Sequence, residues 1–273
     1  MPVTGRTRTV IVGVTGRMGQ ALLRAAAEFA DLAITGAVAS AHSASLGRDA
    51  GEPVGVRLGV AVTADLPATL GAADVVIDFS HPQAAAEHLA ACRAAGKPLL
   101  IGTTGFAPQL AETELEAASR DIALLVAPNT SLGVTLLAEL VRIAARALPA
   151  QFDIEILERH HRMKLDAPSG TALALARAAA EGRNLPAAEA TATVGASRAG
   201  PRRHGEIGFA VLRGGDAVGE HEVWFAGPGE QLSLSHQATD RALFARGALR
   251  AALWLAHQAA GRYTMRDILF KNQ

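Results

Sequence analysis

A strand, a glycine-rich turn and a helix near the start of the chain constrain its fold more than any other feature. Residues 10–14 predict a buried strand, and apolar residues repeat at helical spacing over 20–29. Between them the sequence reads Gly13-Val14-Thr15-Gly16-Arg17-Met18-Gly19. Glycines in such a turn let the backbone approach a pyrophosphate, and the N–H groups of the helix start face its charge. The turn therefore predicts a dinucleotide site. Its G-x-x-G-x-x-G spacing, with Thr15 at the usual middle glycine, also suits a turn that only packs the helix on the strand.

Strand and helix patterns then alternate through the first half of the chain. Short apolar runs bounded by polar residues are typical of strands buried in a parallel sheet. The predicted strands span 32–39, 73–79, 99–101 and 122–126, and the predicted helices span 82–95 and about 109–119. This order predicts an α/β fold with a Rossmann-like doubly wound parallel sheet, whose ligand lies at the carboxyl ends of the strands.

Polar residues follow three of these strands, as Ser80-His81, Gly102-Thr103-Thr104-Gly105-Phe106 and Ala127-Pro128-Asn129-Thr130. Each alone is typical of ordinary capping chemistry, but three at one sheet edge favour a ligand site. Another strand ends in Ala39-Ser40-Ala41-His42, where an acidic residue would read the ribose of NAD. No carboxylate stands there. His42 or Arg48 could instead meet the 2′-phosphate of NADP, so the choice of cofactor stays open.

A basic loop organises the second half. A predicted strand over 152–157, with Phe152, Ile154 and Ile156 on one face, leads into His160-His161-Arg162-Met163-Lys164-Leu165-Asp166-Ala167-Pro168-Ser169-Gly170-Thr171, and a helix follows to about Gly182. A helix start offers unpaired N–H groups to an anion, and Ser169 or Thr171 either caps the helix or turns its hydroxyl toward a ligand. With the cations and an imidazole, this predicts a pocket for a small carboxylate that also receives a proton. A solvated loop is the alternative. No zinc spacing such as HExxH is present, so no metal is expected.

The rest of the second half predicts a helix, a surface loop and a mostly antiparallel sheet. The expected elements are a helix over 132–148 with Leu136, Leu137, Leu140 and Ile143 in the core, a loop over 183–205 with solvated Arg198, Arg202 and Arg203, strands over 206–212, 218–225 and 232–236, and a final helix over 240–257. Such a small sheet leaves an edge and a face to cover, which favours self-association. His88, Cys92 and His257 lie on helical runs and are interpreted as packing or surface residues.

Composition excludes several classes of protein. Lys plus Arg and Asp plus Glu both number 26, so no overall charge drives binding to nucleic acid or an acidic membrane. No apolar run approaches the roughly 20 residues of a spanning helix. Residues 1–9 are polar and do not resemble a signal peptide. Cys92 is the only cysteine, which fits a reducing compartment, and we expect a soluble cytoplasmic protein.

The chain resembles the dihydrodipicolinate reductase family of lysine and diaminopimelate biosynthesis. The resemblance rests on the glycine turn, on Gly102 to Phe106, on the run from Glu158 to Thr171, on Gly215-Asp216-x-Val218-Gly219-Glu220-His221, and on Met265-Arg266-Asp267. These motifs span nearly the whole chain in order, and the run from Glu158 is the most specific.

The resemblance implies an NADH- or NADPH-dependent reduction of 4-hydroxy-tetrahydrodipicolinate, through dihydrodipicolinate, to tetrahydrodipicolinate. It implies that Gly13 to Met18, Ser40, Gly102 to Thr104 and Ala127 to Thr130 hold the cofactor. His160 would donate the proton with Lys164 as an essential partner, and a histidine near its ordinary pKa suits that task at neutral pH. His161, Lys164, Ser169, Gly170 and Thr171 would hold the two carboxylates of the substrate.

The resemblance also implies the domain organisation and the assembly. Residues 1–130 and 240–273 would form the dinucleotide-binding domain, residues 131–239 would form the substrate-binding and oligomerisation domain, and the antiparallel sheets would build a homotetramer. Two other functions stay open. One is another imine reductase or amino-acid dehydrogenase of the same architecture. The other is a non-catalytic nucleotide sensor, in which the basic loop would bind an effector.

Overall fold

The chain folds into two compact units in the computed structural model, which describes residues 5–105, 110–185, 202 and 205–271. The first unit comprises Met1–Ser131 and Ala242–Gln273, and the second comprises Leu132–Arg241. These bounds differ by one or two residues from those expected at 130 and 240. The cofactor and substrate roles expected for the two units stay predictions.

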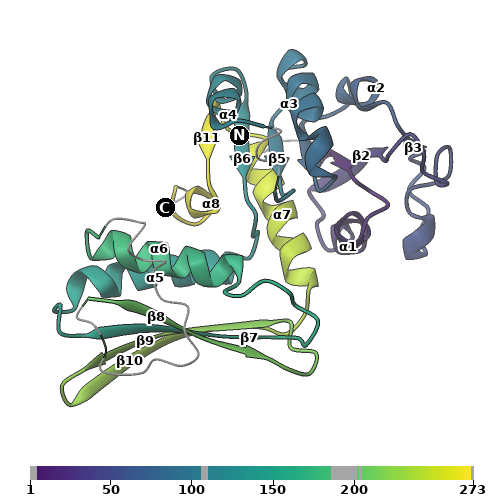
Figure 1. Ribbon diagram of the computed structural model, residues 1–273. Helices are drawn as coiled ribbons and strands as arrows, with labels where there is room; N and C mark the ends of the chain where they lie inside the picture. Colours follow the sequence, from purple (N-terminus) through teal and green to yellow (C-terminus); the bar gives the residue numbers. More distant parts are fainter. Residues whose placement is uncertain (1–4, 106–109, 186–201, 203–204, 272–273) are drawn as a thin grey trace. The chain divides into compact units, whose positions relative to one another are not determined.

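A parallel sheet with helices on both faces forms the first unit (Figure 1). Its elements are β1 (Thr7–Val12), α1 (Arg17–Ala26), β2 (Leu32–Val38), η1 (Glu52–Val54), β3 (Val62–Thr63), α2 (Leu66–Leu70), β4 (Val75–Asp78), η2 (Pro82–Ala84), α3 (Ala85–Ala94), β5 (Leu99–Ile101), α4 (Glu112–Ser119), β6 (Ala123–Val126), α7 (Ala242–Leu255), β11 (Gly261–Tyr263) and α8 (Met265–Phe270). The seven strands lie in the order β11-β6-β5-β4-β1-β2-β3, and every neighbouring pair is parallel. This is the doubly wound order, so the predicted Rossmann-like fold is confirmed.

Alternate residues of the central strands pack against opposite helix layers. Val10 and Val12 of β1 belong to a core that also contains Leu66 of α2, Leu89 of α3 and Leu115 of α4. Residues between them, such as Ile11, are equally buried on the other face, where α1 and α7 contact one another. Because both faces are covered, these strands are apolar throughout, which explains why short apolar runs predicted them.

The strands end level with one another at the carboxyl edge of this sheet. Val12 pairs with Val38 and with Asp78, Asp78 pairs with Ile101, and Ile101 pairs with Val126. The segments that follow these strands therefore start at the same edge. The switch in strand order falls between β1 and β4, the place where doubly wound folds bind their ligands.

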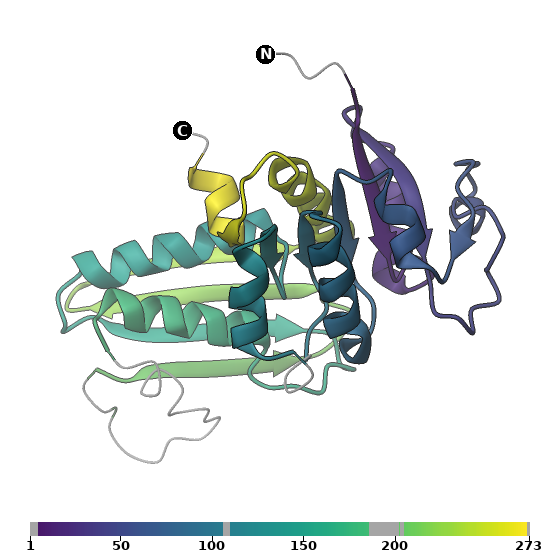
Figure 2. The same ribbon diagram turned by 90° about the horizontal axis from the view of Figure 1, so that it is seen from above.

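A four-stranded sheet covered on one face by two helices forms the second unit. Its elements are α5 (Leu132–Ala147), β7 (Asp153–His160), α6 (Gly170–Gly182), β8 (Ile207–Arg213), β9 (Gly219–Gly227) and β10 (Glu230–Ala238). The strand order is β10-β9-β7-β8, in which β9 is antiparallel to both neighbours and β8 is parallel to β7. The two helices lie side by side across the sheet in both ribbon views (Figure 1, Figure 2). The sheet is mostly antiparallel, as predicted, with β7 as its fourth strand.

The buried face of α5 differs from the predicted one. Leu136, Leu140 and Ile143 were expected in the core, but their exposed fractions are 44%, 42% and 42%. Leu137 is buried as predicted, and Val141 and Ala145 join it in a core shared with α6 and the sheet. Apolar residues follow two sides of this helix at the same spacing, so periodicity alone cannot choose between them. The close approach of α6 determines which side of α5 is buried. The two helices lie so close that a Cβ at Gly182 of α6 would lie 2.4 Å from the carbonyl oxygen of Arg142 of α5.

Strand β7 is longer than predicted, and this extension positions the candidate site. It continues to His160 instead of ending near residue 157, so Glu158 and His160 lie on the buried face after Ile154 and Ile156. Five short elements had no predicted counterpart, namely η1, β3, α2, β11 and α8. The longest of them has six residues, which is too short to generate a clear periodic pattern. The helix expected to end the chain is α7, and β11 and α8 follow it.

Three predicted features lie wholly or partly outside the described residues. They are Phe106 after β5, Arg198 and Arg203 of the predicted surface loop, and most of that loop itself. Arg202 is described, and it forms ion pairs with Asp153 and Glu155 of β7 rather than standing in solvent alone. None of the described helices is long and apolar enough to cross a membrane.

Candidate active site

The turn after β1 excludes side chains at two of its glycines. Gly13 has a φ of +80°, and a Cβ there would lie 2.5 Å from the carbonyl oxygen of Phe79. A Cβ at Gly19 would lie 2.3 Å from the carbonyl oxygen of Gly13. No side chain caps α1 after Gly16, so the first N–H groups of that helix face the carboxyl edge without a side-chain acceptor. A backbone cradle beside an uncapped helix start fits the pyrophosphate of a dinucleotide.

The predicted cofactor residues in this turn differ in what they offer a ligand. Thr15, Gly16 and Arg17 are exposed, and Met18 is half-buried. Val14 is buried in the core, with 2% of its surface exposed. Val14 therefore reaches a ligand only through its backbone.

A buried carboxylate ties together the segments after β4 and β5. Asp78 is fully buried, its Oδ1 accepts from the N–H of Ser80 (2.8 Å), and its carbonyl oxygen accepts from the N–H of Gly102 (2.9 Å). Its Oδ2 lies 2.8 Å from Nδ1 of His88, which also lies 3.3 Å from Oγ of Ser80. The interpretation of His88 as a packing or surface residue was therefore incomplete, since His88 pairs with the carboxylate that shapes this edge.

Two hydroxyl groups expected near the cofactor point into the protein instead. The Thr130 hydroxyl donates to the carbonyl oxygen of Phe244 in α7 (2.6 Å), and Thr130 is buried. The Thr103 hydroxyl lies 3.4 Å from the carbonyl oxygens of Asp78 and Ser80. These threonines hold the segments in place. Thr104 is exposed, Pro128 is exposed, and Ala127 is buried, so a ligand here meets mainly backbone atoms.

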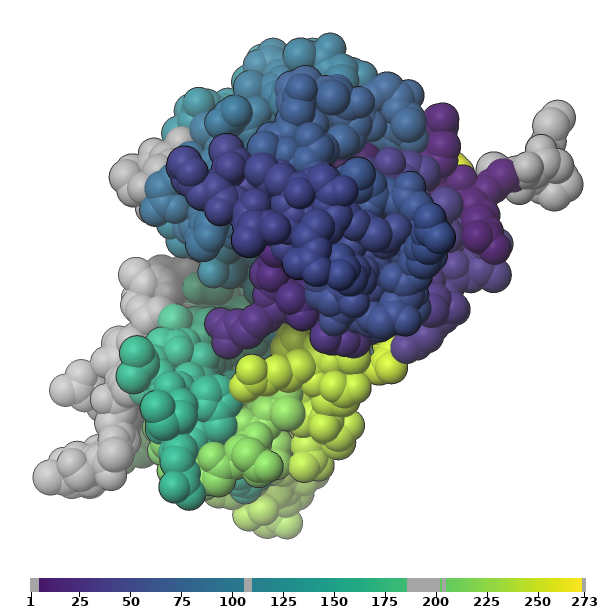
Figure 3. Space-filling model, turned by 90° about the vertical axis from the view of Figure 1, so that its right-hand side faces the viewer, coloured from purple at the N-terminus to yellow at the C-terminus, as the bar shows by residue number. Residues whose placement is uncertain are grey.

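The segment after β2 lies on the surface of the first unit, in dark blue tones in Figure 3. Ala39 is buried, whereas Ser40 and His42 are exposed and joined by a turn in which Ser40 Oγ accepts from the N–H of His42 (3.3 Å). Arg48 forms an exposed ion pair with Glu52 through its Nε (2.9 Å). No carboxylate takes part in the Ser40–His42 turn, in agreement with the sequence.

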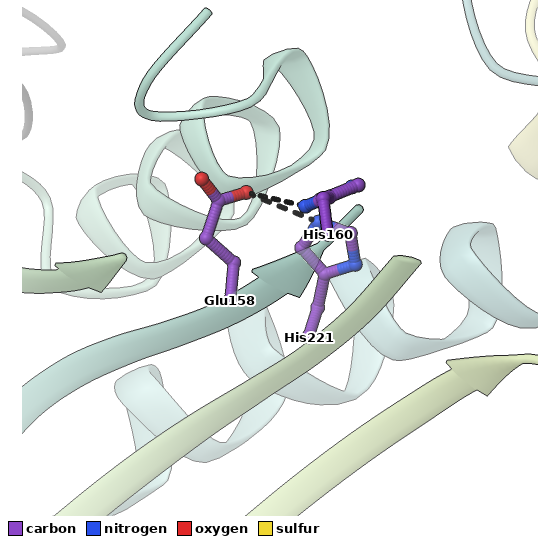
Figure 4. A group of neighbouring side chains, drawn as sticks. All are labelled: Glu158, His160 and His221. Carbon is purple, nitrogen blue, oxygen red and sulfur yellow. Dashed lines mark ion pairs between the residues drawn. The ribbon is translucent and has the colours of Figure 1, made fainter. Parts of the chain in front are cut away.

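In the second unit, two neighbouring strands bring a carboxylate and two imidazoles together (Figure 4). Glu158 and His160 are two residues apart on β7 and share its buried face, and His221 stands opposite Glu158 on β9. The Nδ1 of His160 lies 3.4 Å from Glu158 Oε2, and the Nε2 of His221 lies 3.6 Å from the same oxygen. The rings of His160 and His221 meet edge to face, with centroids 5.1 Å apart.

The other oxygen of Glu158 accepts two hydrogen bonds. Its Oε1 accepts from Nη2 of Arg213 (2.8 Å) and from the N–H of Ser169 (3.1 Å). The Ser169 hydroxyl accepts from the N–H of Ala172 (3.1 Å) as the cap of α6, and it lies 3.0 Å from Nε2 of His221. Ser169 therefore does cap the helix, and both of its polar groups are used inside the protein.

Burial and neighbouring charges set the protonation of this cluster. Burial alone would raise the pKa of Glu158, but hydrogen bonds from His221, Ser169 and Arg213 outweigh it and hold this pKa well below its usual range. Burial above all lowers the pKa of His160 to about 4; the Glu158 carboxylate opposes this, and the charges of His221, Lys164 and Arg213 add to it. The expectation that His160 keeps an ordinary pKa is therefore wrong for the free protein, in which His160 is neutral at pH 7.

The same three side chains have the spacing of a metal site, since Glu158, His160 and His221 each offer an atom within 4.8 Å of the others. Arg213 already donates to Glu158, and the charge of Lys164 acts on His160. Two fixed positive charges at this position oppose a bound cation. The cluster is better suited to handling a proton.

The basic loop after His160 is held by the turn between β8 and β9. The N–H of His161 donates to the carbonyl oxygen of Ala217 (2.8 Å), and the N–H of Gly214 donates to that of His160 (3.0 Å). Within the loop, Nζ of Lys164 donates to both carboxylate oxygens of Asp166 (2.7 and 2.8 Å). Lys164 is thus ion-paired in the free protein, with a partner whose side chain is 60% exposed.

The helix start beyond the loop is open to a ligand. Gly170 is exposed and Thr171 is half-buried at the first turn of α6, a helix of 13 residues. Lys164 and His161 are half-buried. The predicted substrate residues and His160 thus belong to one short segment that leads from the end of β7 to the start of α6, as expected.

Glu158, Arg213 and His221 carry much of this geometry and had no predicted role. Glu158 and His221 lie within motifs shared with the family, but their residue types alone indicate no role. One signal was available, because Glu158 and His160 continue the two-residue alternation of Ile154 and Ile156 on a buried face. Polar residues at buried strand positions need partners, and a strand that ends at residue 157 leaves out both Glu158 and His160.

A doubly wound sheet with a glycine turn, in one chain with a buried imidazole that precedes a helix start, is typical of a nicotinamide-dependent oxidoreductase. Two family patterns match nearly the whole chain. They are "Dihydrodipicolinate reductase, N-terminus" over residues 7–130 and "Dihydrodipicolinate reductase, C-terminus" over residues 133–269. The chain belongs to the dihydrodipicolinate reductase family, and it is an NADH- or NADPH-dependent oxidoreductase.

Individual relatives agree with this membership. The 4-hydroxy-tetrahydrodipicolinate reductase of Allorhizobium ampelinum is 50% identical over 264 residues, which cover 96% of this chain and 97% of the relative. That of Anaeromyxobacter dehalogenans is 47% identical, with coverage of 96% and 97%.

Solved structures agree at the level of the fold. A dihydrodipicolinate reductase from a Paenisporosarcina species, with dipicolinate bound, has a TM-score of 0.75 at 23% identity, covering 95% of this chain and 97% of its own. An amine dehydrogenase from Mycobacterium smegmatis has a TM-score of 0.60 at 16% identity, covering 96% of both chains.

Proposed function

We propose that this chain reduces 4-hydroxy-tetrahydrodipicolinate, through dihydrodipicolinate, to tetrahydrodipicolinate in lysine and diaminopimelate biosynthesis. The identity of the substrate is inferred from the names of the relatives, which are 4-hydroxy-tetrahydrodipicolinate reductases. The observation that carries the proposal is the placement of His160 and Lys164 within one segment that ends at the open start of α6. A nucleotide sensor needs no proton donor beside an anion site, so this combination favours the reductase.

The first unit holds the cofactor in this proposal. The backbone around Gly13, the start of α1 and the segments beginning at Gly102 and Ala127 meet at one sheet edge, which fits a dinucleotide. When bound, the cofactor supplies a hydride from C4 of its nicotinamide ring. Asp78, paired with His88, keeps the segment beginning at Gly102 and the segment after β4 in place.

The second unit holds the substrate, whose two carboxylates need two anion sites. The N–H groups of Gly170 and Thr171 at the start of α6 form one site. His161 and Lys164 supply the other, because their side chains come from the loop that precedes the helix. Ser169 contributes by capping the helix and not by direct contact, since both of its polar groups already have partners.

His160 donates the proton that follows hydride transfer to the substrate ring. In the free protein its pKa lies at about 4, first because of burial, so it must gain a proton as the substrate binds. Two substrate carboxylates placed beside the imidazole favour its charged form and raise this pKa. Lys164 stabilises the negative character that develops on the ring during the same step.

Both cofactors serve this reaction, and no carboxylate at Ala39 or Ser40 repels a 2′-phosphate. We expect their kcat/KM values to differ by less than about a hundredfold, or roughly 3 kcal/mol. Ser40→Asp should tilt the ratio toward NADH. A strict preference of the unaltered protein for NADH would contradict this reading of the segment after β2.

We also propose a homotetramer in the cytoplasm. The face of the second sheet opposite its helices carries Leu157, Leu212 and Trp224, and 57% of the Leu212 surface is exposed. Within the described part of the second unit no helix covers this face, and β10 and β8 are the edge strands, an arrangement that favours association with copies of itself. The single thiol, Cys92, is buried and unpaired, which suits a reducing compartment.

A binding experiment tests the substrate class. Pyridine-2,6-dicarboxylate presents two carboxylates on a planar ring, and pyridine-2-carboxylate presents one. Titration calorimetry should find the dicarboxylate bound at least about tenfold more tightly, because only it fills both anion sites. Equal affinities would mean that one anion site is missing, and the proposed substrate class would be wrong.

A further inference from the structure

Glu158 stands between the proton donor and the start of the substrate-binding helix. One of its oxygens faces Nδ1 of His160 (3.4 Å), and the other accepts from the N–H of Ser169 (3.1 Å), the cap of α6. Glu158 is 1% exposed, so water does not replace these partners. A single carboxylate therefore contacts both parts of the site.

We propose that Glu158 is a positioning residue that sets the tautomer and charge of His160 while it fixes the start of α6. The proposal rests on the proposed function, in which His160 donates a proton and α6 binds a carboxylate. Glu158 itself does not touch the substrate. Its oxygens are directed toward Arg213, Ser169 and the two histidines.

The geometry assigns the tautomer of His160. An ionised carboxylate only accepts hydrogen bonds, so the ring nitrogen that faces it carries the hydrogen. Nδ1 of His160 faces Glu158, and Nε2 is left for the substrate. Gly219 leaves space beside Nε2, because a Cβ at that position would lie 3.0 Å from this atom. In the free protein Nδ1 of His160 and Oε2 of Glu158 lie 3.4 Å apart without a hydrogen bond, and neither atom has another hydrogen-bond partner. This separation can shorten to a hydrogen bond when His160 becomes charged.

The charge of Glu158 opposes the three other groups whose charges act most on His160. Lys164 of the basic loop, Arg213 of β8 and His221 of β9 all disfavour the imidazolium, and Glu158 of β7 favours it. The proposed proton transfer requires the imidazolium to form when substrate binds. Glu158 is the group within the described part of the chain that offsets the burial of His160.

Replacing Glu158 by glutamine should reverse the direction of a hydrogen bond between residue 158 and His160. Arg213 and Ser169 both donate to Oε1, so the amide oxygen of Glu158→Gln occupies that side. Its amide N–H then faces Nδ1 of His160 and donates to it, which moves the ring hydrogen to Nε2. The variant thus loses the negative charge and acquires the opposite tautomer.

Nitrogen-15 NMR of His160 in the ligand-free protein tests the assignment without depending on catalysis. We expect the Nδ1–H tautomer in the unaltered protein and mainly the Nε2–H tautomer in Glu158→Gln. Glu158→Asp keeps the charge and should keep the Nδ1–H tautomer. Finding Nε2–H in the unaltered protein would overturn the proposal even if Glu158→Gln failed to fold, and failure of the reductase activity would leave this measurement intact.

Kinetics provide the second readout. Glu158→Gln should lower kcat at least about tenfold at pH 7.5 and move the alkaline decline of kcat to lower pH by about one unit. Glu158→Asp should retain the pH at which kcat declines. Glu181→Gln is the matched control, because it removes a carboxylate at the opposite end of α6 and should leave both values unchanged. If Glu158→Gln lowered kcat by the same factor at every pH, Glu158 would be only a structural partner of Arg213, which would contradict the proposal.

Discussion

Lys164 pairs with Asp166 in the free protein, and this pair must separate when a substrate carboxylate arrives. The Asp166 side chain is 60% exposed, and exposed ion pairs contribute at most about 1 kcal/mol, so exchange is easy. Several groups share the substrate carboxylates, and losing one cation weakens binding modestly. Fewer groups stabilise the negative charge that develops on the substrate ring during hydride transfer. Lys164 should therefore matter more for kcat than for KM.

We predict that Lys164→Ala lowers kcat by about a hundredfold or more with a smaller rise in KM, about 3 kcal/mol in all. His160→Gln should have a similar effect, and the double variant should fall short of the sum because both residues act on one transition state. Asp166→Asn is the control and should change KM less than about fivefold. If Lys164→Ala raised only KM, the lysine would be a simple carboxylate anchor.

The neutral state of His160 predicts how stability depends on pH. Its folded pKa of about 4, set first by burial, lies below the ordinary value of about 6.5. Between these two pH values the unfolded chain therefore binds more protons than the folded chain. The contribution of His160 to the stability of the folded protein is complete above about pH 6.5 and is lost as pH falls toward 4. Between pH 7 and 4, the free energy of unfolding measured with denaturant should fall by up to about 3 kcal/mol more in the unaltered protein than in His160→Gln. Identical pH dependence in the two proteins would contradict the depressed pKa.

At the scale of elements, the turn after β1 has a steric requirement that can be separated from backbone strain. Gly13 and Gly59 both have positive φ, +80° and +73°. A Cβ at Gly13 would collide with the backbone of Phe79, whereas a Cβ at Gly59 meets nothing within 4 Å. Gly59→Ala should cost about 1 kcal/mol from strain alone, and Gly13→Ala should cost at least about 2 kcal/mol more. If thermal unfolding showed that Gly13→Ala and Gly59→Ala lose equal amounts of stability, β1 and β4 would be able to separate at this turn.

The elements that the sequence predicted best are those whose burial is uniform. Strands β4, β5 and β6 are covered on both faces, so their apolar runs identified them without knowledge of their neighbours. The buried side of α5 depended on α6, and of the residues that periodicity placed in the core only Leu137 is buried. In the site, the residue types of the basic loop were informative, but Glu158 and His88 needed a partner from another element. Such partners depend on the folded arrangement.

For the whole molecule, the apolar residues on the face of the second sheet opposite its helices predict association. One chain has a mass of 28.2 kDa, so a homotetramer has about four times this mass. Light scattering at micromolar concentration should report the tetramer. Leu212→Glu, which places a charge on that face, should shift the population toward smaller species. A mass near 28.2 kDa for the unaltered protein would contradict the assembly.

The catalytic assignment depends on turnover by the intact protein. NADH or NADPH oxidation is followed at 340 nm while the product of dihydrodipicolinate synthase is supplied, with pyridine-2-carboxylate as the control compound. We predict a steady loss of absorbance with either cofactor that requires the synthase product and falls about a hundredfold in Lys164→Ala. Saturating substrate without oxidation of either cofactor by the folded protein would contradict the reductase assignment.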